Sequence, residues 1–121
     1  MPSSSESDLK SAVHGLTYIS ETDAPIETIS LKHHAASPSG VLAFGNHPAV
    51  TPIQQVSLKI FFGSQDQADA GMCRLRETIE RVLTDIEVFR VGNVDVTYYV
   101  VGKSGNQLLG IRTSAVETGS S

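Results

Sequence analysis

The sequence predicts an α+β fold, arranged as a three-layer α/β/α sandwich around a mainly antiparallel sheet of about four strands. Two patterns support this prediction. Apolar residues recur at helical spacing near the N-terminus and again over residues 68–85, and they alternate with period two after residue 88. The segment 98–101 is apolar on both faces of its expected strand, which indicates that helices cover both sides of the sheet.

The N-terminal segment predicts one helix, one loop and one strand. Ser5 followed by Asp8 is typical of a helix cap, and the apolar spacing after it predicts a helix over about residues 6–14. The polar stretch at residues 20–25 ends in proline and predicts an exposed loop. A short strand is expected at residues 26–31.

The middle of the chain predicts irregular structure and then an ambiguous segment. Residues 32–52 contain three of the four histidines together with several prolines and glycines, so we expect irregular chain there. Between Val56 and Phe62 the apolar residues alternate as in a strand, whereas Ser57 is a suitable cap for a short helix that ends at Gly63. We favour the short helix.

The C-terminal half predicts a long helix and a meander. A helix over residues 68–85 is expected from one apolar stripe, formed by Met72, Leu75, Ile79, Val82, Leu83 and Ile86. Beyond it, turn residues at 92–93 and 102–106 separate three apolar segments, at residues 88–91, 94–101 and 108–116. These segments predict three antiparallel strands, to which the strand at residues 26–31 adds a fourth.

Length and charge restrict the class of protein. A chain of 121 residues that is 40% hydrophobic suffices for one domain with one core. The net charge of −4 and the nine scattered Lys and Arg residues argue against direct binding of nucleic acid. The N-terminus lacks the apolar region of a secretory signal, and no run approaches the roughly 20 apolar residues that a membrane helix needs. With a single cysteine, the sequence predicts a cytoplasmic protein that does not bind a membrane.

Two motifs resemble ligand sites but are incomplete. Gly102-Lys103-Ser104 resembles the end of a phosphate-binding loop, yet Thr97 stands where that loop requires glycine, so a hairpin turn is the better interpretation. His33 and His34 are adjacent and lack a further ligand at metal-site spacing, so we interpret them as solvated loop residues.

The sequence contains no complete catalytic arrangement either. Cys73 has no motif that would position a base beside it, and its helical spacing predicts a small, partly buried residue. The carboxylate pairs Glu21/Asp23 and Asp66/Asp69 are suitable for acid–base chemistry, but nothing in the sequence brings either pair into a cleft. We therefore predict a binding protein that is not an enzyme, with no cofactor and no metal ion of its own.

Three blocks of the sequence resemble the nuclease A inhibitor family. The first block is Gly15-Leu16-Thr17-Tyr18-Ile19 followed by Ser20-Glu21-Thr22-Asp23-Ala24-Pro25, which resembles the family segment G-L-x, two hydrophobic residues, S-E-x-[DE]-x-P. The second is the Phe61-Phe62 pair before the long helix, and the third is the pair of closing hairpins at residues 89–96 and 109–118. Residues 32–60 match the family poorly.

The resemblance implies both the domain and its function. It implies a single nuclease-inhibitor-like domain over residues 1–118, followed by a flexible tail at residues 119–121. Such a protein is a monomer that forms a 1:1 complex with a sugar-nonspecific nuclease and blocks its magnesium-containing active site. In the family a Glu of the S-E loop reaches the nuclease metal, and the matching residue here is Glu21. Magnesium prefers oxygen ligands, so one carboxylate can take the place of a phosphate oxygen or a bound water.

Further contacts implied by the resemblance follow Glu21 in the sequence. Thr22 and Asp23, with Glu27, are expected at the rim of the interface. Gln65 and Asp66 match a family contact region.

The chain departs from the family pattern in two places. In the family a tryptophan follows the Gln-Asp pair, but here Gln67 follows and the chain has no tryptophan, so a usual interface anchor is missing. The family's chain end also approaches the metal, and Glu117 and Thr118 match it, although residues 119–121 follow in this chain.

Two other functions stay open. The missing tryptophan and the residues after Thr118 are compatible with a non-catalytic binding or regulatory module on the same fold, whose partner is not a nuclease. A pocket near His33, His34 and His47 would instead indicate a small enzyme or a ligand-binding domain.

Overall fold

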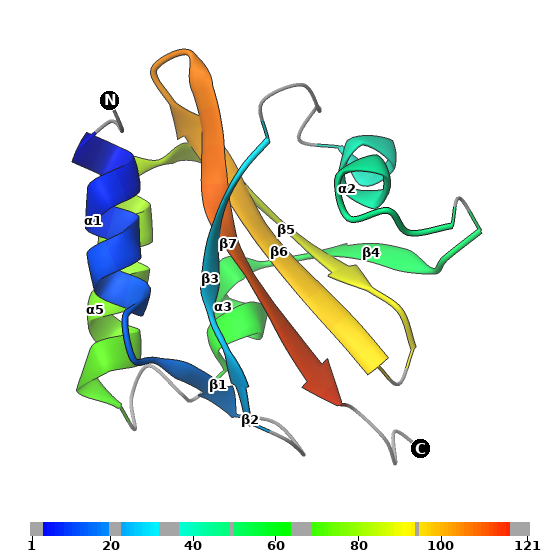
Figure 1. Ribbon diagram of the computed structural model, residues 1–121, viewed down its shortest axis with the longest axis horizontal. Helices are drawn as coiled ribbons and strands as arrows, with labels where there is room; N and C mark the ends of the chain where they lie inside the picture. Colours follow the sequence, from blue (N-terminus) through cyan, green and yellow to red (C-terminus); the bar gives the residue numbers. More distant parts are fainter. Residues whose placement is uncertain are drawn as a thin grey trace.

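The computed structural model describes residues 4–19, 23–31, 37–48, 50–63, 69–93 and 95–116. In this part of the chain the helices are α1 (Ser4–Val13), α2 (Pro38–Phe44), α3 (Leu58–Phe62) and α5 (Ala70–Val82). The strands are β1 (Thr17–Ile19), β2 (Asp23–Pro25), β3 (Glu27–Ser30), β4 (Ile53–Val56), β5 (Thr84–Val91), β6 (Asp95–Ser104) and β7 (Gln107–Val116). The predicted α+β class is therefore confirmed, and Figure 1 shows helices on both sides of a twisted sheet.

The main sheet is larger than predicted. Among the described residues it has five strands in the order β3-β7-β6-β5-β4, with every neighbouring pair antiparallel, and β1 and β2 form a separate two-stranded sheet. The expected count of about four strands did not include β4, whose sequence Ile-Gln-Gln-Val does not alternate. Pairing with β5 along a sheet edge determines this strand, and a local pattern does not show such pairing.

The C-terminal meander confirms the period-two pattern. β6 pairs with β5 on one side and with β7 on the other, and the two long strands β6 and β7 stay in register from Asp95–Val116 to Ser104–Gln107. Gly110 is required within this register, because a side-chain carbon at that position would overlap the Val100 main-chain oxygen on the paired strand.

One face of the sheet carries the larger core. The helices α1, α3 and α5 cover this face, and the buried side chains between them and the sheet include Leu75, Ile79, Phe61, Val100 and Ile111. The apolar stripe predicted for the long helix is confirmed for Met72, Leu75 and Ile79, which are buried, whereas Leu83 and Ile86 lie beyond the end of the helix.

Two predicted helix boundaries are wrong. The long helix ends at Val82, before the predicted end at residue 85, because Leu83 is already extended and Asp85 lies in β5. Ser5 lies inside α1 rather than at its cap, since that helix begins at Ser4.

The other face carries a smaller core under α2. This helix lies within the segment predicted to be irregular, so that prediction is wrong for residues 38–44. Ser37 caps the helix by accepting a hydrogen bond from the Gly40 main-chain nitrogen at 3.2 Å, and Pro38 occupies the first turn, where a missing N–H costs nothing. Val41 and Leu42 pack against Leu31, Phe89 and Val101. Because α2 covers only part of this face, a full three-layer sandwich is not confirmed.

The ambiguous segment resolves into a short helix after a strand. Ser57 accepts a hydrogen bond from the Ile60 main-chain nitrogen at 3.1 Å and caps α3, which ends before Gly63, as the favoured interpretation predicts. Val56, the first residue of the alternating pattern, belongs to β4.

Candidate functional site

The segment that carries Glu21 connects the two strands of the β1–β2 hairpin. Ile19 pairs with Asp23, so Ser20, Glu21 and Thr22 are the whole connection. These three residues lie outside the described part of the chain, and of Asp23 only the backbone is described. The prediction of an exposed loop over residues 20–25 is wrong for Asp23–Pro25, which form β2 and pair with β1.

Two side-chain hydroxyl groups fix this hairpin to the rest of the protein. The Tyr18 hydroxyl donates a 2.6 Å hydrogen bond to the main-chain oxygen of Phe61, and the two rings stack with centroids 4.8 Å apart. On the other strand, the Thr113 hydroxyl donates a 2.9 Å hydrogen bond to the main-chain oxygen of Pro25. The hairpin is thus held to α3 through β1 and to β7 through β2, and both bonded residues lie within four positions of Glu21.

The predicted contact segments adjoin one end of the molecule. The β1–β2 hairpin, the start of α5 and the end of β7 all lie at the lower end of the view in Figure 1. The start of α5 packs against Leu16, the residue before β1, because a side chain added at Gly71 would meet Leu16. We name this end the hairpin edge: the β1–β2 hairpin, the start of α5 and the end of β7.

The remaining predicted contacts are close in sequence to the elements of the hairpin edge. Gln65 and Asp66 precede α5, whose cap Asp69 accepts a 2.8 Å hydrogen bond from the Gly71 main-chain nitrogen. Glu117 and Thr118 follow the last residue of β7, Val116. All four side chains lie outside the described residues, so their role stays a prediction.

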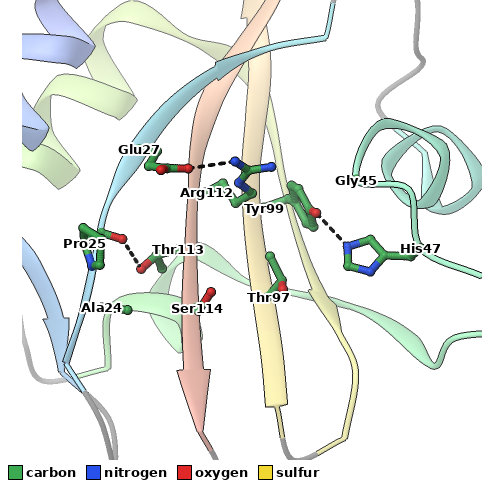
Figure 2. A pocket seen from close by; sticks show the side chains of 10 residues that line it. All are labelled: Ala24, Pro25, Glu27, Gly45, His47, Thr97, Tyr99, Arg112, Thr113 and Ser114. Carbon is green, nitrogen blue, oxygen red and sulfur yellow. Dashed lines mark hydrogen bonds and ion pairs between the residues drawn. The ribbon is translucent and has the colours of Figure 1, made fainter.

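A groove opens on the sheet face that α2 leaves uncovered, next to the hairpin edge. It is a cavity of about 300 Å³. Its floor is formed by β6 and β7, one wall by β2 and β3, and the other wall by the chain after α2 (Figure 2). The residues that line it are Ala24, Pro25, Glu27, Gly45, His47, Thr97, Tyr99, Arg112, Thr113 and Ser114.

A row of hydrogen bonds crosses the groove. Arg112 Nη2 donates to Glu27 Oε2 at 2.7 Å, and the Tyr99 hydroxyl lies 2.7 Å from His47 Nε2 (Figure 2). Burial raises the pKa of the Tyr99 hydroxyl, and the charge of Arg112 and a hydrogen bond from it oppose that rise. The hydrogen bond to Glu27 raises the pKa of Arg112, against the effect of burial. The guanidinium therefore stays charged between the carboxylate and the phenol.

The Tyr99 hydroxyl and His47 Nε2 share one hydrogen bond, whose donor depends on which ring nitrogen of His47 carries the proton. Gly45 makes room for this contact, because a side-chain carbon there would overlap the Tyr99 hydroxyl and lie 2.6 Å from the His47 ring.

Sequence reasoning did not find the groove. His47 was considered only as one of three histidines near a hypothetical pocket, and His33 and His34 lie outside the described residues. Arg112 is the charged residue within β7, and this charge was the available signal.

Outside the groove, two questions concern the described residues: whether they form a metal-binding cluster, and whether Cys73 lies where it was predicted. Within the part of the chain that the structure describes, no group of three or more His, Cys, Asp or Glu residues is placed to hold a metal ion. Cys73 was predicted to be partly buried and is exposed, with its sulfur 3.9 Å from Glu77 Oε1. No helix in the described residues has the length and apolar character to span a membrane.

Comparison with known proteins identifies the family. No curated protein matches this chain. The family model described as NuiA, nuclease A inhibitor-like protein, matches residues 4–118, which is nearly the whole sequence and includes the hairpin, the start of α5 and the end of β7. The chain therefore belongs to the nuclease A inhibitor-like family.

Proposed function

We propose that this protein inhibits a magnesium-dependent, sugar-nonspecific endonuclease by covering its active site, with the Glu21 carboxylate reaching the nuclease metal. Family membership over residues 4–118 is the observation that supports nuclease inhibition. The role of Glu21 is supported by its position as the middle residue of a three-residue connection between paired strands.

A fixed hairpin suits this mechanism. A carboxylate competes for a metal ion only if it is held where a phosphate oxygen or a water would bind, and ordering a mobile segment on binding costs affinity. The bonds from Tyr18 to Phe61 and from Thr113 to Pro25 hold both strands before the nuclease arrives, so less ordering remains for the encounter.

We propose that the other contacts come from segments next to the hairpin edge. We propose that Thr22 and Asp23 contact the nuclease beside Glu21, that Gln65 and Asp66 contact it from the segment before α5, and that Glu117 and Thr118 contact it after β7. Nuclease clefts that bind phosphate present basic residues, and an acidic surface would steer the inhibitor toward them.

The proposal includes the organisation and location of the inhibitor. It acts as a non-catalytic monomer in a 1:1 complex, in the cytoplasm, with residues 1–118 as the inhibitory domain and residues 119–121 as a tail. Its alternative is a binding or regulatory module with a partner other than a nuclease.

A pair of charge-neutralising variants tests the proposal. Glu21→Gln removes the carboxylate proposed to reach the metal, whereas Asp85→Asn removes one from the opposite end of the sheet. Asp85 has a φ of 50°, a conformation that asparagine also tolerates, so this control keeps its backbone.

Inhibition of magnesium-dependent DNA cleavage is then measured by titrating each protein into a sugar-nonspecific nuclease. Glu21→Gln should weaken inhibition by at least ~2 kcal/mol, roughly thirtyfold in Kd, and Asp85→Asn should not. Equal inhibition by both variants would remove Glu21 from the mechanism. Absence of inhibition by the unmodified protein, with capture of an unrelated partner, would favour the alternative.

A further inference from the structure

The groove beside the hairpin edge contains a positively charged side chain, whereas the charged residues among the predicted contacts are acidic. The charged residues among those contacts are Glu21, Asp23, Asp66 and Glu117, all negative. Arg112, by contrast, lies on the groove floor. A partner surface that carried only positive charges would therefore place one of them next to the Arg112 guanidinium.

Arg112 retains hydrogen-bonding capacity toward the groove. A guanidinium has five N–H groups. Among the described residues, one of them bonds Glu27 at 2.7 Å, and other N–H groups are available to a further acceptor. The Arg112 side chain is 38% exposed, so an incoming group can reach it. Both of its neighbours fix its orientation, and a fixed guanidinium binds a carboxylate with little ordering cost.

The other polar groups of the groove favour an acceptor as well. The hydroxyl groups of Thr97 and Ser114 lie in the same cavity and can donate. Glu27, the carboxylate already in the groove, is 56% exposed and belongs to the rim, so it can share Arg112 with a second carboxylate.

The position of the groove identifies its occupant. Ala24 and Pro25, which line it, follow Asp23 directly, and Ser114 lies three residues before Glu117. A protein that covers the hairpin connection and the residues after β7 would also cover the groove between them.

We propose that the groove receives an acidic side chain of the partner, whose carboxylate binds Arg112 with the Ser114 and Thr97 hydroxyl groups beside it. This inference rests on the proposed function for the identity of the partner. In this interface the inhibitor is acidic except at Arg112, where the partner supplies the carboxylate. This pair fixes the orientation of docking, because a partner bound in the opposite orientation would place like charges next to each other.

Two variants that each remove one positive charge test this proposal, by the direction in which they change inhibition in the nuclease titration. Arg112→Ala and Lys103→Ala each remove one positive charge, but Lys103 pairs with Asp85 at the far end of the sheet. Long-range attraction to a basic cleft would strengthen binding equally in both variants. A direct contact should weaken binding by Arg112→Ala about tenfold or more and leave Lys103→Ala unaffected.

Removing the competing carboxylate gives the opposite expectation. Glu27→Gln and Asp85→Asn each remove one negative charge, and Glu27→Gln should inhibit more strongly because Arg112 is released for the partner. Weaker inhibition by Glu27→Gln than by Asp85→Asn would overturn the proposal, as would equal inhibition by Arg112→Ala and Lys103→Ala.

A measurement without nuclease separates this inference from the proposed function. N-acetylglutamate amide, a small molecule with one side-chain carboxylate, is titrated into the isotope-labelled protein. The Arg112 side-chain and Ser114 main-chain signals should shift in the unmodified protein, and the Ser114 signal should not shift in Arg112→Ala. If neither signal moves, the groove does not bind a carboxylate, whatever the nuclease titration shows.

Discussion

The two faces of the main sheet differ in what covers them. One face is sealed by α1, α3 and α5 over a continuous apolar core, and the other is covered by α2 over only part of its area. Alternate residues of the same strands meet these two environments: on β6, Val100 is fully buried in the first core, while Thr97 lines the groove on the second face. The larger apolar core lies on the sealed face, whereas polar side chains line the groove on the other face.

The largest expected effect concerns the sealed face. Leu75 is completely buried, so Leu75→Ala should lower the free energy of unfolding by about 2–5 kcal/mol through lost burial and the cavity left behind. Ser114→Ala, an exposed change on the groove floor, should alter it by less than ~0.5 kcal/mol. Urea unfolding of both variants measures the contrast, and comparable losses would contradict this difference between the two faces.

The next effect concerns the wall of the groove. Gly45→Ala would place a carbon against the Tyr99 hydroxyl and the His47 ring, and the forced displacement should cost about 1–3 kcal/mol of stability. Tyr99→Phe removes the atom nearest to that carbon, so in the Tyr99→Phe background the same substitution should cost less. Thermal or urea unfolding of the four proteins gives this comparison. An undiminished cost would show that Tyr99 does not limit the space at Gly45.

A similar effect is expected where the hairpin joins the sealed face. Tyr18→Phe keeps the ring stacked on Phe61 but removes the hydroxyl, leaving a main-chain oxygen in a buried contact without this donor. The free energy of local opening of the hairpin should fall by about 1–3 kcal/mol. Amide exchange should accelerate at the paired residues Tyr18 and Ala24 and stay unchanged at Val100 in the main sheet. Uniform acceleration would instead indicate a global loss of stability.

The smallest effect is a dependence of stability on alkaline pH. Burial raises the pKa of Tyr99 above the ordinary value of 10.0, so the unfolded chain loses this proton at a lower pH than the folded protein. The contribution of Tyr99 is fully present below pH 10.0 and declines as the pH rises from there through the folded-state pKa. Unfolding measurements across this range should show a shallower decline for Tyr99→Phe, and an identical decline would assign it to other groups.

The elements that sequence patterns predicted are those that their own side chains determine. The stripe through Leu75 and Ile79 predicts α5, and the alternation on both sides of Val100 predicts the meander. The missed elements depend on contacts distant in sequence. β4 is a strand because it pairs with β5, and α2 was hidden by Pro38, a residue that interrupts a helix only after the first turn.

The site was less predictable than the fold. The prediction for Glu21 came from resemblance to a family, and its hairpin setting depends on the pairing of Ile19 with Asp23. The groove could not be predicted, because its polar atoms come from separate parts of the chain: 52 residues separate His47 from Tyr99, and 85 separate Glu27 from Arg112. The pairing of β3 with β7 brings Glu27 beside Arg112, and the chain after α2 brings His47 to Tyr99.

The separation of the β1–β2 hairpin from the main sheet has an evolutionary consequence. The register of the main sheet on this side is set by β3 against β7, after the hairpin has closed, so adding or deleting a residue between Ile19 and Asp23 does not change that register. The length and chemistry of this short connection can therefore diverge while the scaffold stays constant. Substitutions, insertions or deletions confined to this connection would then change the contact surface without changing the sheet.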